Sequence, residues 1–403
     1  MKVKVFFCFG LFSLAFFNAR AIDILGLPIV HDPATIIKDG TKYYEFCTGT
    51  GIRSLYSYDL ITWYDNAYMV FNTEPSWCVK YRDNENDFWA PDIIYMNNAY
   101  YLFYSCSSWG SSYSAIGVAK TKSLNTPSWT DLGEVVSSDG TDTAINAIDP
   151  GIFRDDDGKV YMSYGSWFGG IGIIEIDTVN CKSIGSTTHL YGGSHQSIEA
   201  SYIFKDGDYY YLVVNRGNCC FGVYSTYYIT VGRGTNVKGP YENFRTLLST
   251  DGKYIGPGHF GLLRECGNNY VSIHYYDGNN GGLPILDILK MTMVDGWPVL
   301  TRDYTMELCP TGIYENERIS HRENISFYPN PSEDGNISIE IKNYGALNKN
   351  IVIQIYSTNG SLVYTGKYGP ANIIDIRHGL NTGLYNVLVK TQNEMSSGTL
   401  VIK

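Results

Sequence analysis

The chain has 403 residues, of which 44% are hydrophobic and 15% aromatic, and its formal net charge is −10. This length allows a large core and favours two domains, or one large β-domain with an appendage. Acidic proteins bind nucleic acid poorly, so the charge favours a neutral substrate. The 35 tyrosines favour β-structure and could also form carbohydrate-contact surfaces, although most should be core strand residues.

Residues 1–21 have the features of a secretory signal peptide. Lys2 and Lys4 precede the apolar run "VFFCFGLFSLAFF", and "ARA" at 19–21 offers small residues for cleavage before Ile22. This leader has three basic and no acidic residues, so its removal changes 30 basic against 40 acidic residues to 27 against 40, a net charge of about −13. No apolar run is long enough for a transmembrane helix. We therefore expect a secreted or cell-surface protein with no membrane span and no nucleic-acid partner, and we expect a monomer.

Five segments of the chain share one pattern: a polar residue, a small residue or proline, a short apolar run, a turn and an aromatic-rich alternation. They are "HDPATIIKDGTKYYEF", "WAPDIIYMNNAYYLFY", "IDPGIFRDDDGKVYMSY", "IEASYIFKDGDYYYLV" and "GHFGLLRECGNNYVSIHYY". Their Asp-Gly, Asn-Asn and Gly-Asn-Asn elements are hairpin-turn sequences, and no segment predicts a long amphipathic helix. The repeat therefore predicts an all-β domain.

Alignment of the five segments places Asp32, Ala90, Asp149, Glu199 and His259 in one slot, at intervals of 58, 59, 50 and 60 residues. Such intervals suit four-stranded sheets with their loops, so residues 22–318 predict a five-bladed β-propeller. In a propeller, a slot at the start of each innermost strand becomes a ring around one mouth of the central channel.

Three carboxylates in this ring predict a catalytic site, although single Asp-Pro pairs are often only turn or strand-end caps. Paired carboxylates without a metal cluster, in a secreted aromatic-rich protein, point to glycoside hydrolysis. Apolar neighbours and nearby carboxylates should raise the pKa of Glu199, as a general acid requires. Asp32 is then the candidate base, and Asp149 could orient and tune the acid.

Aromatic and amide side chains near these segments are candidates for sugar binding. Trp89 precedes Ala90 and could stack on a sugar face. Trp109 and Trp167 are weaker candidates for the same role, and a core position is the better explanation of both. Asn146 and Asn215 lie close to the motifs and could bind sugar hydroxyls.

The motifs "HDP", "WAPDI", "AIDPGIF", "SIEASYIF" and "GPGHFG" resemble those of family 43 glycoside hydrolases. The segments at 51–63, "GIRSLYSYDLITW", and 215–234, "NRGNCCFGVYSTYYITVGRG", resemble in particular the endo-1,5-α-L-arabinanases of that family. The resemblance covers about residues 23 to 316 in order.

This resemblance implies an inverting hydrolase that cleaves internal α-1,5-L-arabinofuranosidic bonds of arabinan, a side chain of plant cell-wall pectin. It implies Asp32 as general base, Glu199 as general acid and Asp149 as modulator of the acid's pKa. It also implies that His259 helps to hold a calcium ion in the channel, largely through water. A lone histidine does not by itself indicate calcium, which prefers oxygen ligands.

Two other functions are compatible with the same ring. An exo-acting α-L-arabinofuranosidase or β-xylosidase of the family would share the catalytic residues and differ in the openness of its cleft. A non-catalytic carbohydrate-binding propeller is the alternative from another class, but it would not need a proton donor.

Eight of the nine cysteines remain after the leader takes Cys8, an even number that permits disulfides in an exported protein. Their spacing shows no CxxC metal pattern. The adjacent Cys219 and Cys220 could form a vicinal disulfide or remain two buried thiols.

Residues 324–403 differ in composition and predict a small β-sandwich of short alternating strands with Asn-Gly and Asp-Gly turns. A carbohydrate-binding or spacer domain is the simplest explanation of that pattern. The start "YPNP" at 328–331, "STNG", "GLYNV" and the closing "LVIK" resemble the C-terminal sorting domain of the type IX secretion system. The resemblance implies the secretion machinery as a partner and passage across an outer membrane, with no part for this domain in catalysis. Removal of the domain after export is compatible with it.

Overall fold

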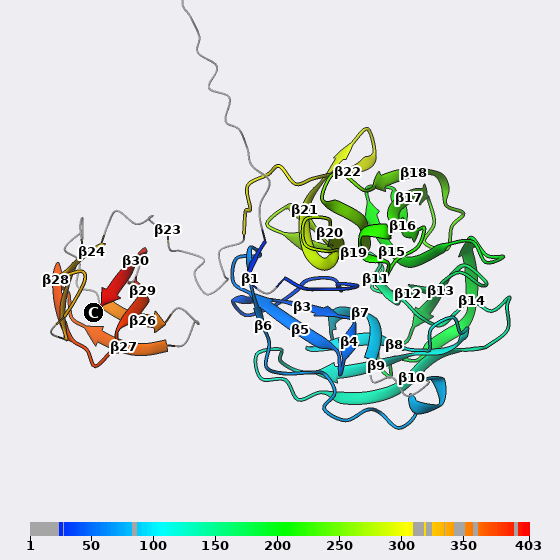
Figure 1. Cartoon of the computed structure of the whole chain (residues 1–403). Helices are drawn as coiled ribbons and strands as arrows, with labels where there is room; N and C mark the ends of the chain where they lie inside the picture. Colours follow the sequence, from blue (N-terminus) through cyan, green and yellow to red (C-terminus); the bar gives the residue numbers. More distant parts are fainter. Residues whose placement is uncertain are drawn as a thin grey trace, which may run out of the picture. The chain divides into compact units, whose positions relative to one another are not determined.

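The structure is a computed structural model that describes residues 24–26, 28–82, 87–308, 318–319, 325–333, 335–341, 351–357, 362–390 and 394–403. The chain divides into two compact units, Met1–Cys309 and Pro310–Lys403 (Figure 1). Strands dominate the described residues, and their only helices are the short 3-10 turns η1 (Val79–Tyr81) and η2 (Gly222–Tyr224). The expectation of an all-β chain is therefore confirmed for this part of it. The predicted signal peptide lies outside the described residues.

Five sheets follow one another along the first unit (Figure 1). The first sheet has the order β1-β6-β5-β3-β2, formed by Leu25–Gly26, Thr62–Asp65, Arg53–Ser57, Lys42–Cys47 and Ile37–Asp39. The second has the order β10-β9-β8-β7-β4, formed by Thr130–Asp139, Tyr113–Thr121, Ala99–Cys106, Asp87–Met96 and Gly49–Thr50. The third contains β11 to β14 in chain order, at Gly151–Arg154, Val160–Tyr164, Ile171–Ile176 and Ser183–Tyr191.

The last two sheets are simple meanders. The fourth contains β15 to β18, at Ile198–Asp206, Tyr209–Arg216, Tyr228–Gly234 and Glu242–Leu248. The fifth contains β19 to β22, at Tyr254–Glu265, Asn268–Asp277, Leu283–Val294 and Trp297–Thr301. Tight turns make this topology possible: between β7 and β8, Asn97 and Asn98 both have positive φ, 49° and 58°. A two-residue turn with two positive φ values matches the right-handed twist of the flanking strands.

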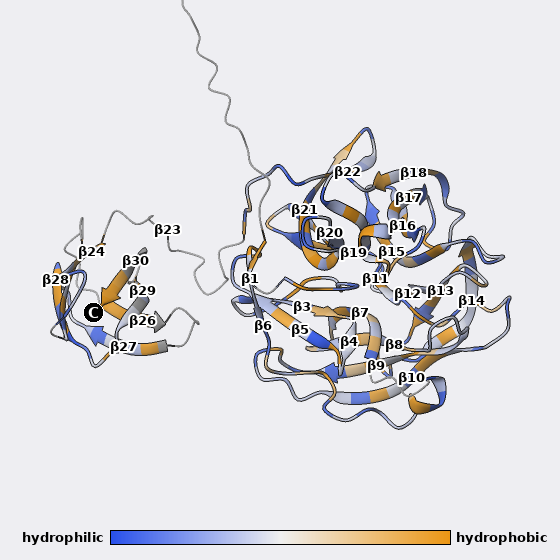
Figure 2. Ribbon diagram, in the orientation of Figure 1, coloured by the Kyte–Doolittle hydropathy of each residue, from blue (hydrophilic) through white to orange (hydrophobic). Residues whose placement is uncertain are grey.

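Each sheet packs on both of its neighbours, because successive residues of a strand face opposite sides. Figure 2 shows this alternation of hydrophobic and hydrophilic residues along strands such as β10. The separate cores between successive sheets contain, in turn, Phe46 with Leu102, Phe103 with Met162, Ile173 with Leu212, Val213 with Ile273, and Leu286 with Leu55. The last of these cores joins the fifth sheet to the first. Backbone bonds from Val30 N–H to Pro284 O and from Leu286 N–H to Pro28 O join the same two sheets.

A shared irregularity in the inner strands corrects the predicted slot. The ladders of β7, β15 and β19 are interrupted between Trp89 and Asp92, between Glu199 and Tyr202, and between Gly258 and Gly261. Glu199 therefore corresponds to Trp89, whereas Ala200 corresponds to Ala90. The backbone agrees, because φ is positive at Asp32, Ala90, Asp149 and Ala200.

The slot of Asp32, Ala90, Asp149 and His259 thus contains Ala200, and Glu199 lies one position earlier. In the first and third sheets that earlier position is held by His31 and Ile148, whose carbonyls accept backbone bonds from Thr48 and Gly165. A β-bulge sets two residues of one strand opposite a single residue of the partner strand, so the side chains of two consecutive residues can face the same space. The predicted single ring of residues therefore consists of two adjacent rings. Glu199 belongs to one of them, and Asp32 and Asp149 belong to the other.

The second unit also contains only strands among its described residues. One sheet has the order β23-β30-β29-β26-β27, at Arg318–Ile319, Glu394–Ile402, Gly383–Lys390, Ile351–Ser357 and Leu362–Tyr368. The other has the order β24-β25-β28, at Ile325–Tyr328, Asn336–Ile341 and Ile373–Arg377. Side chains of both sheets share one core, which includes Ile353, Val387, Ile339 and Ile376. Within the described ranges, no helix has the length and hydropathy needed to span a membrane.

Candidate active site

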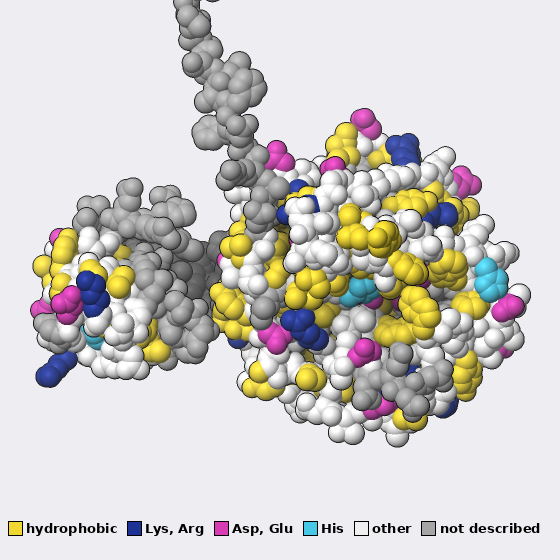
Figure 3. All heavy atoms as spheres, in the orientation of Figure 1, with side chains coloured by type: hydrophobic (Ala, Val, Ile, Leu, Met, Phe, Trp, Pro, Cys, Tyr) yellow, Lys and Arg dark blue, Asp and Glu magenta, His cyan; other side chains and the backbone are white. Residues whose placement is uncertain are grey.

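A cavity of about 360 Å³ collects most of the predicted site residues. Its lining includes Asp32, Trp89, Asn146, Asp149, Trp167 and Glu199. Figure 3 shows hydrophobic side chains around a hollow in which histidine and acidic atoms are visible. The cavity thus has the form of a sugar site, with an apolar wall and a few convergent polar groups.

Asp32 is held by two side chains. Its Oδ2 lies 2.8 Å from His31 Nδ1 and accepts a hydrogen bond of 2.7 Å from Thr48 Oγ1. The Thr48 hydroxyl is itself oriented, because its oxygen accepts the N–H of Ala90 at 2.9 Å. Burial alone would raise the pKa of Asp32, but the charge and hydrogen bond of His31 outweigh it and lower that pKa well below its usual range. Asp32 is therefore ionised at any ordinary pH, as a base must be.

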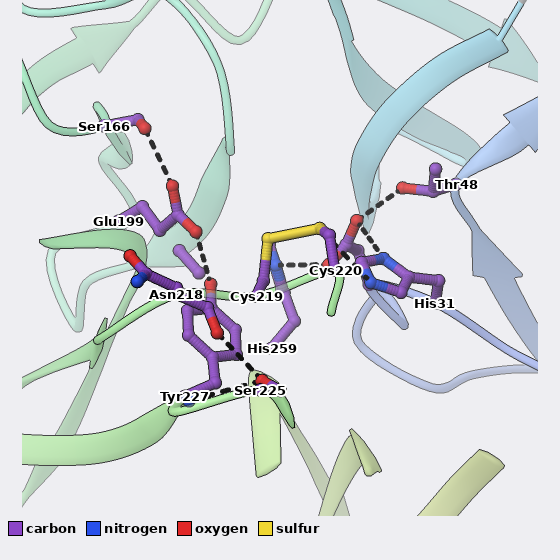
Figure 4. Close-up of a disulfide and its surroundings, with 12 residues drawn as sticks. His31, Thr48, Ser166, Glu199, Asn218, Cys219, Cys220, Ser225, Tyr227 and His259 are labelled. Carbon is purple, nitrogen blue, oxygen red and sulfur yellow. Dashed lines mark hydrogen bonds and ion pairs between the residues drawn. A yellow bond between two sulfur atoms is a disulfide. The ribbon is translucent and has the colours of Figure 1, made fainter. Parts of the chain in front are cut away.

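Glu199 accepts hydrogen bonds from three donors. Ser166 Oγ and Trp167 Nε1 donate to its Oε2 at 2.9 and 3.1 Å. Tyr227 Oη donates to its Oε1 at 2.9 Å (Figure 4). Burial raises the pKa of Glu199 above its usual value, the donors partly oppose this, and the charge of Asp32 raises the pKa further. The environments of Asp32 and Glu199 thus push their pKa values apart.

Asp149 is bonded to the backbone beside Glu199. Its N–H donates to Ser105 Oγ at 3.0 Å, and its Oδ2 accepts the N–H of Ala200 at 3.1 Å. Burial raises the pKa of Asp149 well above its usual value, and the charges of Glu199 and Asp32 raise it further. Since Asp149 and Glu199 repel each other when both are ionised, the pair retains a proton at higher pH than isolated carboxyls would.

His259 lies beside Asp32 and is outside the cavity lining. Its Nδ1 is 3.8 Å from Asp32 Oδ1, and its side chain is buried. Burial lowers the pKa of His259, so its ring is neutral and can offer a lone pair. Calcium takes six to eight oxygen ligands, and one imidazole with one carboxylate falls short of that number. These residues fit a hydrated ion whose other ligands are water.

A second group near Asp32, His31 with His274, does not fit direct metal coordination. His31 uses Nδ1 on Asp32, and its Nε2 lies 2.7 Å from Tyr276 Oη. His274 Nδ1 accepts the N–H of Asp32 at 3.1 Å. The ring nitrogens that face the carboxylate are thus already engaged in hydrogen bonds.

Three of the predicted sugar-binding side chains line the cavity. Trp89 packs edge-on against Trp109, with ring centroids 6.5 Å apart. Trp109 is 70% exposed, so the expectation that it is a core residue is wrong. Asn146 is buried and lines the cavity, and its Oδ1 lacks a hydrogen-bond partner, so this amide remains a candidate to bind a sugar hydroxyl. The third, Trp167, is half-buried, and its Nε1 donates the hydrogen bond to Glu199.

Asn215 is not among the cavity-lining residues. It pairs with Glu199 in the β15–β16 ladder, and its Nδ2 donates to the Pro257 carbonyl at 3.1 Å. This amide ties β16 to β19, so the structure gives Asn215 a scaffold position behind the acid instead of a sugar contact.

The side chains that hold the carboxylates were not identified from the sequence. His31, Thr48, Ser166 and Tyr227 all line the cavity. Only His31 had a local signal, since it precedes Asp32 in the "HDP" motif. The others lie in connecting segments next to other strands, and no local pattern marks them.

Cys219 and Cys220 form a disulfide at the cavity wall (Figure 4). The alternative of two buried thiols is therefore wrong, since Cys220 is also exposed. A second disulfide joins the buried residues Cys78 and Cys106, whereas Cys47 and Cys181 are free and buried.

Comparison with known proteins adds the family. Residues 27–298 match the family model for glycosyl hydrolases family 43, and residues 326–403 match a secretion system C-terminal sorting domain. An extracellular endo-α-(1→5)-L-arabinanase of Bacillus subtilis (strain 168) is 36% identical over 288 residues, which are 67% of this chain and 87% of that protein. An extracellular exo-α-(1→5)-L-arabinofuranosidase of Cellvibrio japonicus (strain Ueda107) is 34% identical, over 67% of this chain and 85% of that protein.

The solved structure of a family 43 endo-arabinanase from Bacillus licheniformis superimposes with a TM-score of 0.65 at 37% identity, covering 69% of this chain and 99% of that one. The family match includes all three carboxylates of the cavity and strands of all five sheets. This chain therefore belongs to the family 43 glycoside hydrolases and carries a C-terminal secretion sorting domain.

Proposed function

We propose that this chain is an inverting endo-acting hydrolase of the α-1,5-L-arabinofuranosidic bonds of arabinan. One observation carries the proposal: a single cavity holds Asp32, whose pKa is lowered, and Glu199, whose pKa is raised. Two carboxyl groups with divergent pKa values supply a base and an acid in the same pH range. The endo- and exo-arabinanase relatives support arabinan as the substrate class.

The proposed architecture is a five-bladed β-propeller followed by a β-sandwich. The five successive sheets, with the fifth packed on the first, support five blades around one axis. The two sheets of the C-terminal unit around their common core support the sandwich. We retain the domain limits 22–318 and 324–403 as part of this proposal, except that Arg318 and Ile319 belong with the sandwich, because β23 pairs with β30.

In the proposed reaction, Asp32 removes a proton from a water molecule whose oxygen attacks the anomeric carbon. Glu199 gives its proton to the glycosidic oxygen as the bond from that oxygen to the anomeric carbon breaks. Asp149 holds the N–H of Ala200 and disfavours ionisation of Glu199, which keeps the acid protonated. Solvent then returns Asp32 and Glu199 to their starting protonation states.

Calcium is proposed as a resident ion held by His259 largely through water. When bound, it would supply positive charge beside Asp32 and so favour the ionised base. The chain's own residues already lower the pKa of Asp32, so the ion would add to an existing effect.

Digestion of linear, debranched arabinan tests the endo assignment. We expect a ladder of oligosaccharides early in the reaction, because an endo enzyme cuts internal bonds. Arabinose as the sole early product would instead support the exo-acting alternative. Absence of any hydrolysis of arabinan, with retained binding, would favour the non-catalytic carbohydrate-binding propeller.

Export is part of the proposal. The match of residues 326–403 to a secretion sorting domain and the predicted signal peptide at 1–21 support passage through the type IX system to the cell surface or medium. Deletion of residues 324–403 should leave the enzyme inside the cell envelope, as immunoblots of cell fractions would reveal.

A further inference from the structure

The turn that contains the Cys219–Cys220 disulfide forms part of the wall of the catalytic cavity. In the view of Figure 4 the disulfide stands between Glu199 and the His31 side of the site. Asn218, Cys219, Cys220 and Phe221 all line the cavity. The turn is anchored at its base, since Ser225 Oγ and the N–H of Thr226 both donate to the Asn218 carbonyl, at 2.8 and 3.1 Å.

A chain of hydrogen bonds leads from this turn to Asp32. The N–H of Cys220 donates to Tyr276 Oη at 2.7 Å, and Tyr276 Oη lies 2.7 Å from His31 Nε2. His31 Nδ1 lies 2.8 Å from Asp32 Oδ2. The chain joins three parts of the sequence that are far apart.

The amide at one end of this chain leaves the Tyr276 proton free to continue it. An N–H can only donate, so the Tyr276 oxygen accepts from Cys220, and its single proton is free to point at His31 Nε2. Burial lowers the pKa of His31, but the charge and hydrogen bond of Asp32 and the charge of Glu199 outweigh it and raise that pKa above its usual value. At pH above this raised value His31 is neutral, and a neutral ring that accepts at Nε2 carries its proton on Nδ1, where it donates to the Asp32 carboxylate. Burial raises the pKa of Tyr276, so its hydroxyl keeps the proton that this arrangement needs. The ring of His31 is further fixed by stacking on His274, with centroids 4.3 Å apart.

The disulfide acts on the donor at the start of the chain. The Cys220 nitrogen belongs to the peptide bond between the two cysteines, and their sulfur–sulfur bond closes a small ring around that peptide. Cys220 has a φ of 69°, in the left-handed region that non-glycine residues seldom adopt. Ring closure limits rotation on both sides of the peptide and so holds the N–H toward Tyr276.

We propose that the Cys219–Cys220 turn is a positioning element for the base, which orients His31 through Tyr276 and thereby directs the His31 Nδ1–H at Asp32. The inference rests on the proposed function in taking Asp32 as the base, while the hydrogen-bond chain itself does not depend on the substrate. Cys219, Cys220 and Tyr276 are positioning residues, because they act on Asp32 through His31.

The test measures the protonation of the two ring nitrogens of His31 by NMR of enzyme labelled with ¹⁵N-histidine. The His31 signals are identified as those that disappear from the spectrum of a His31→Gln sample. At pH 8 the parent should show a protonated Nδ1 and an unprotonated Nε2. In the double variant Cys219→Ser/Cys220→Ser, and in Tyr276→Phe, the His31 signals should shift toward a mixture of the two tautomers. kcat on linear arabinan should fall about tenfold, since small displacements of a positioned group cost up to about a hundredfold.

Reduction of the disulfide in the folded parent enzyme tests the same proposal without requiring a variant to fold. Dithiothreitol supplies two electrons and two protons to the disulfide, which becomes two thiols, and is itself oxidised to a cyclic disulfide. Cys220 is exposed whereas Cys78 and Cys106 are buried, so mild treatment should reduce Cys219–Cys220 before Cys78–Cys106. Cys266 is also exposed and disulfide-bonded but is not part of the cavity lining, so the double serine variant shows whether its reduction has any effect. The His31 shift and the loss of kcat should both appear and should be reversed by reoxidation. The double serine variant should not respond to the reductant.

Tyr224→Ala is the matched control, because Tyr224 lies in the same turn, is 84% exposed and is outside the cavity lining. It should keep the parental His31 signals and kcat. Unchanged His31 nitrogens after loss of the disulfide would overturn the proposal, even if kcat fell, because the turn would then act only as a wall. A parent that does not hydrolyse arabinan would refute the proposed function, while the His31 signals would still decide this inference.

Discussion

Tyr227 lies 28 residues after Glu199 in the chain, immediately before β17, and its hydroxyl donates a hydrogen bond to Glu199 Oε1 at 2.9 Å. With Ser166 and Trp167 on the other oxygen, every donor around this carboxyl favours its ionised form. Burial nevertheless raises the pKa of Glu199 above its usual value. The acid is thus tuned by opposing effects, and each can be altered separately.

Tyr227→Phe should move the basic limb of the kcat/KM profile to higher pH. The variant removes a hydrogen bond that stabilises the carboxylate, so the pKa of Glu199 rises further, and activity is lost only when pH rises through this higher value. The expected displacement is about one pH unit, the equivalent of one hydrogen bond to a charged group. Tyr224→Phe, at an exposed position, should leave the profile unchanged. A limb that moves to lower pH would contradict this account of Glu199.

Glu199→Gln should lower kcat on arabinan by about 10²–10⁴-fold while substrate binding remains near parental. Glutamine keeps the shape of the side chain but cannot donate a proton to the glycosidic oxygen. An aryl arabinofuranoside with a good leaving group needs little protonation, so its hydrolysis should be affected much less. Asp32→Asn should instead impair both substrates, because each needs an activated water. Equal losses on both substrates in Glu199→Gln would rule out the acid role.

Trp109→Ala should raise KM for long arabino-oligosaccharides more than for arabinobiose. Trp109 is 70% exposed and packs edge-on against Trp89 at the cavity, where a bound chain would extend. Loss of an aromatic contact of about 0.5–1.5 kcal/mol predicts a change of roughly two- to tenfold. Steady-state kinetics on a size series measures it. A uniform change for all lengths would place Trp109 outside the binding path.

Glu45→Leu should stabilise the first unit, most strongly at high pH. Glu45 is fully buried, both of its carboxyl oxygens lack partners, and burial together with the charge of Asp92 raises its pKa well above the usual value. A carboxyl with a raised pKa in the folded state costs stability as pH rises above the unfolded pKa of about 4.3 and through the folded value. Removing it should therefore gain about 1–3 kcal/mol at pH 8 and less at pH 4.5.

Urea unfolding followed by tryptophan fluorescence measures the effect, because all seven tryptophans lie in the first unit. The exposed Glu242→Gln serves as the surface control and should change stability by less than about 0.5 kcal/mol. A destabilised Glu45→Leu variant would mean that the carboxyl has a structural partner.

Removal of divalent cations should lower kcat if calcium occupies the position proposed beside His259. Activity after treatment with EDTA should return on addition of calcium, since the ion would favour the ionised form of Asp32. His259→Ala should show less dependence on added calcium than the parent. Full activity of the metal-depleted parent would remove calcium from the proposal.

The errors of the sequence-based site have a common physical origin. Turn residues and alternation are local, so they predicted the hairpins and the all-β character correctly. Alignment of the repeats placed Glu199 in the slot of Asp149, whereas the ladder places Ala200 there. The bulge that displaces Glu199 by one residue arises from the pairing of β15 with β16. It cannot be recognised from the sequence of β15 alone.

The sequence by itself determined the carboxylates Asp32, Asp149 and Glu199, the strand-and-turn pattern and the motifs of the family. Those features are local in the chain. Only the tertiary structure decided how the carboxyls are controlled, because burial and hydrogen bonds across 245 residues, as between His31 and Tyr276, arise when distant sheets meet. It also decided that Cys219 and Cys220 are bonded and stand at the wall of the cavity. The residue types thus supply the reactive groups, and the packing of five sheets gives each carboxyl the environment that determines its pKa.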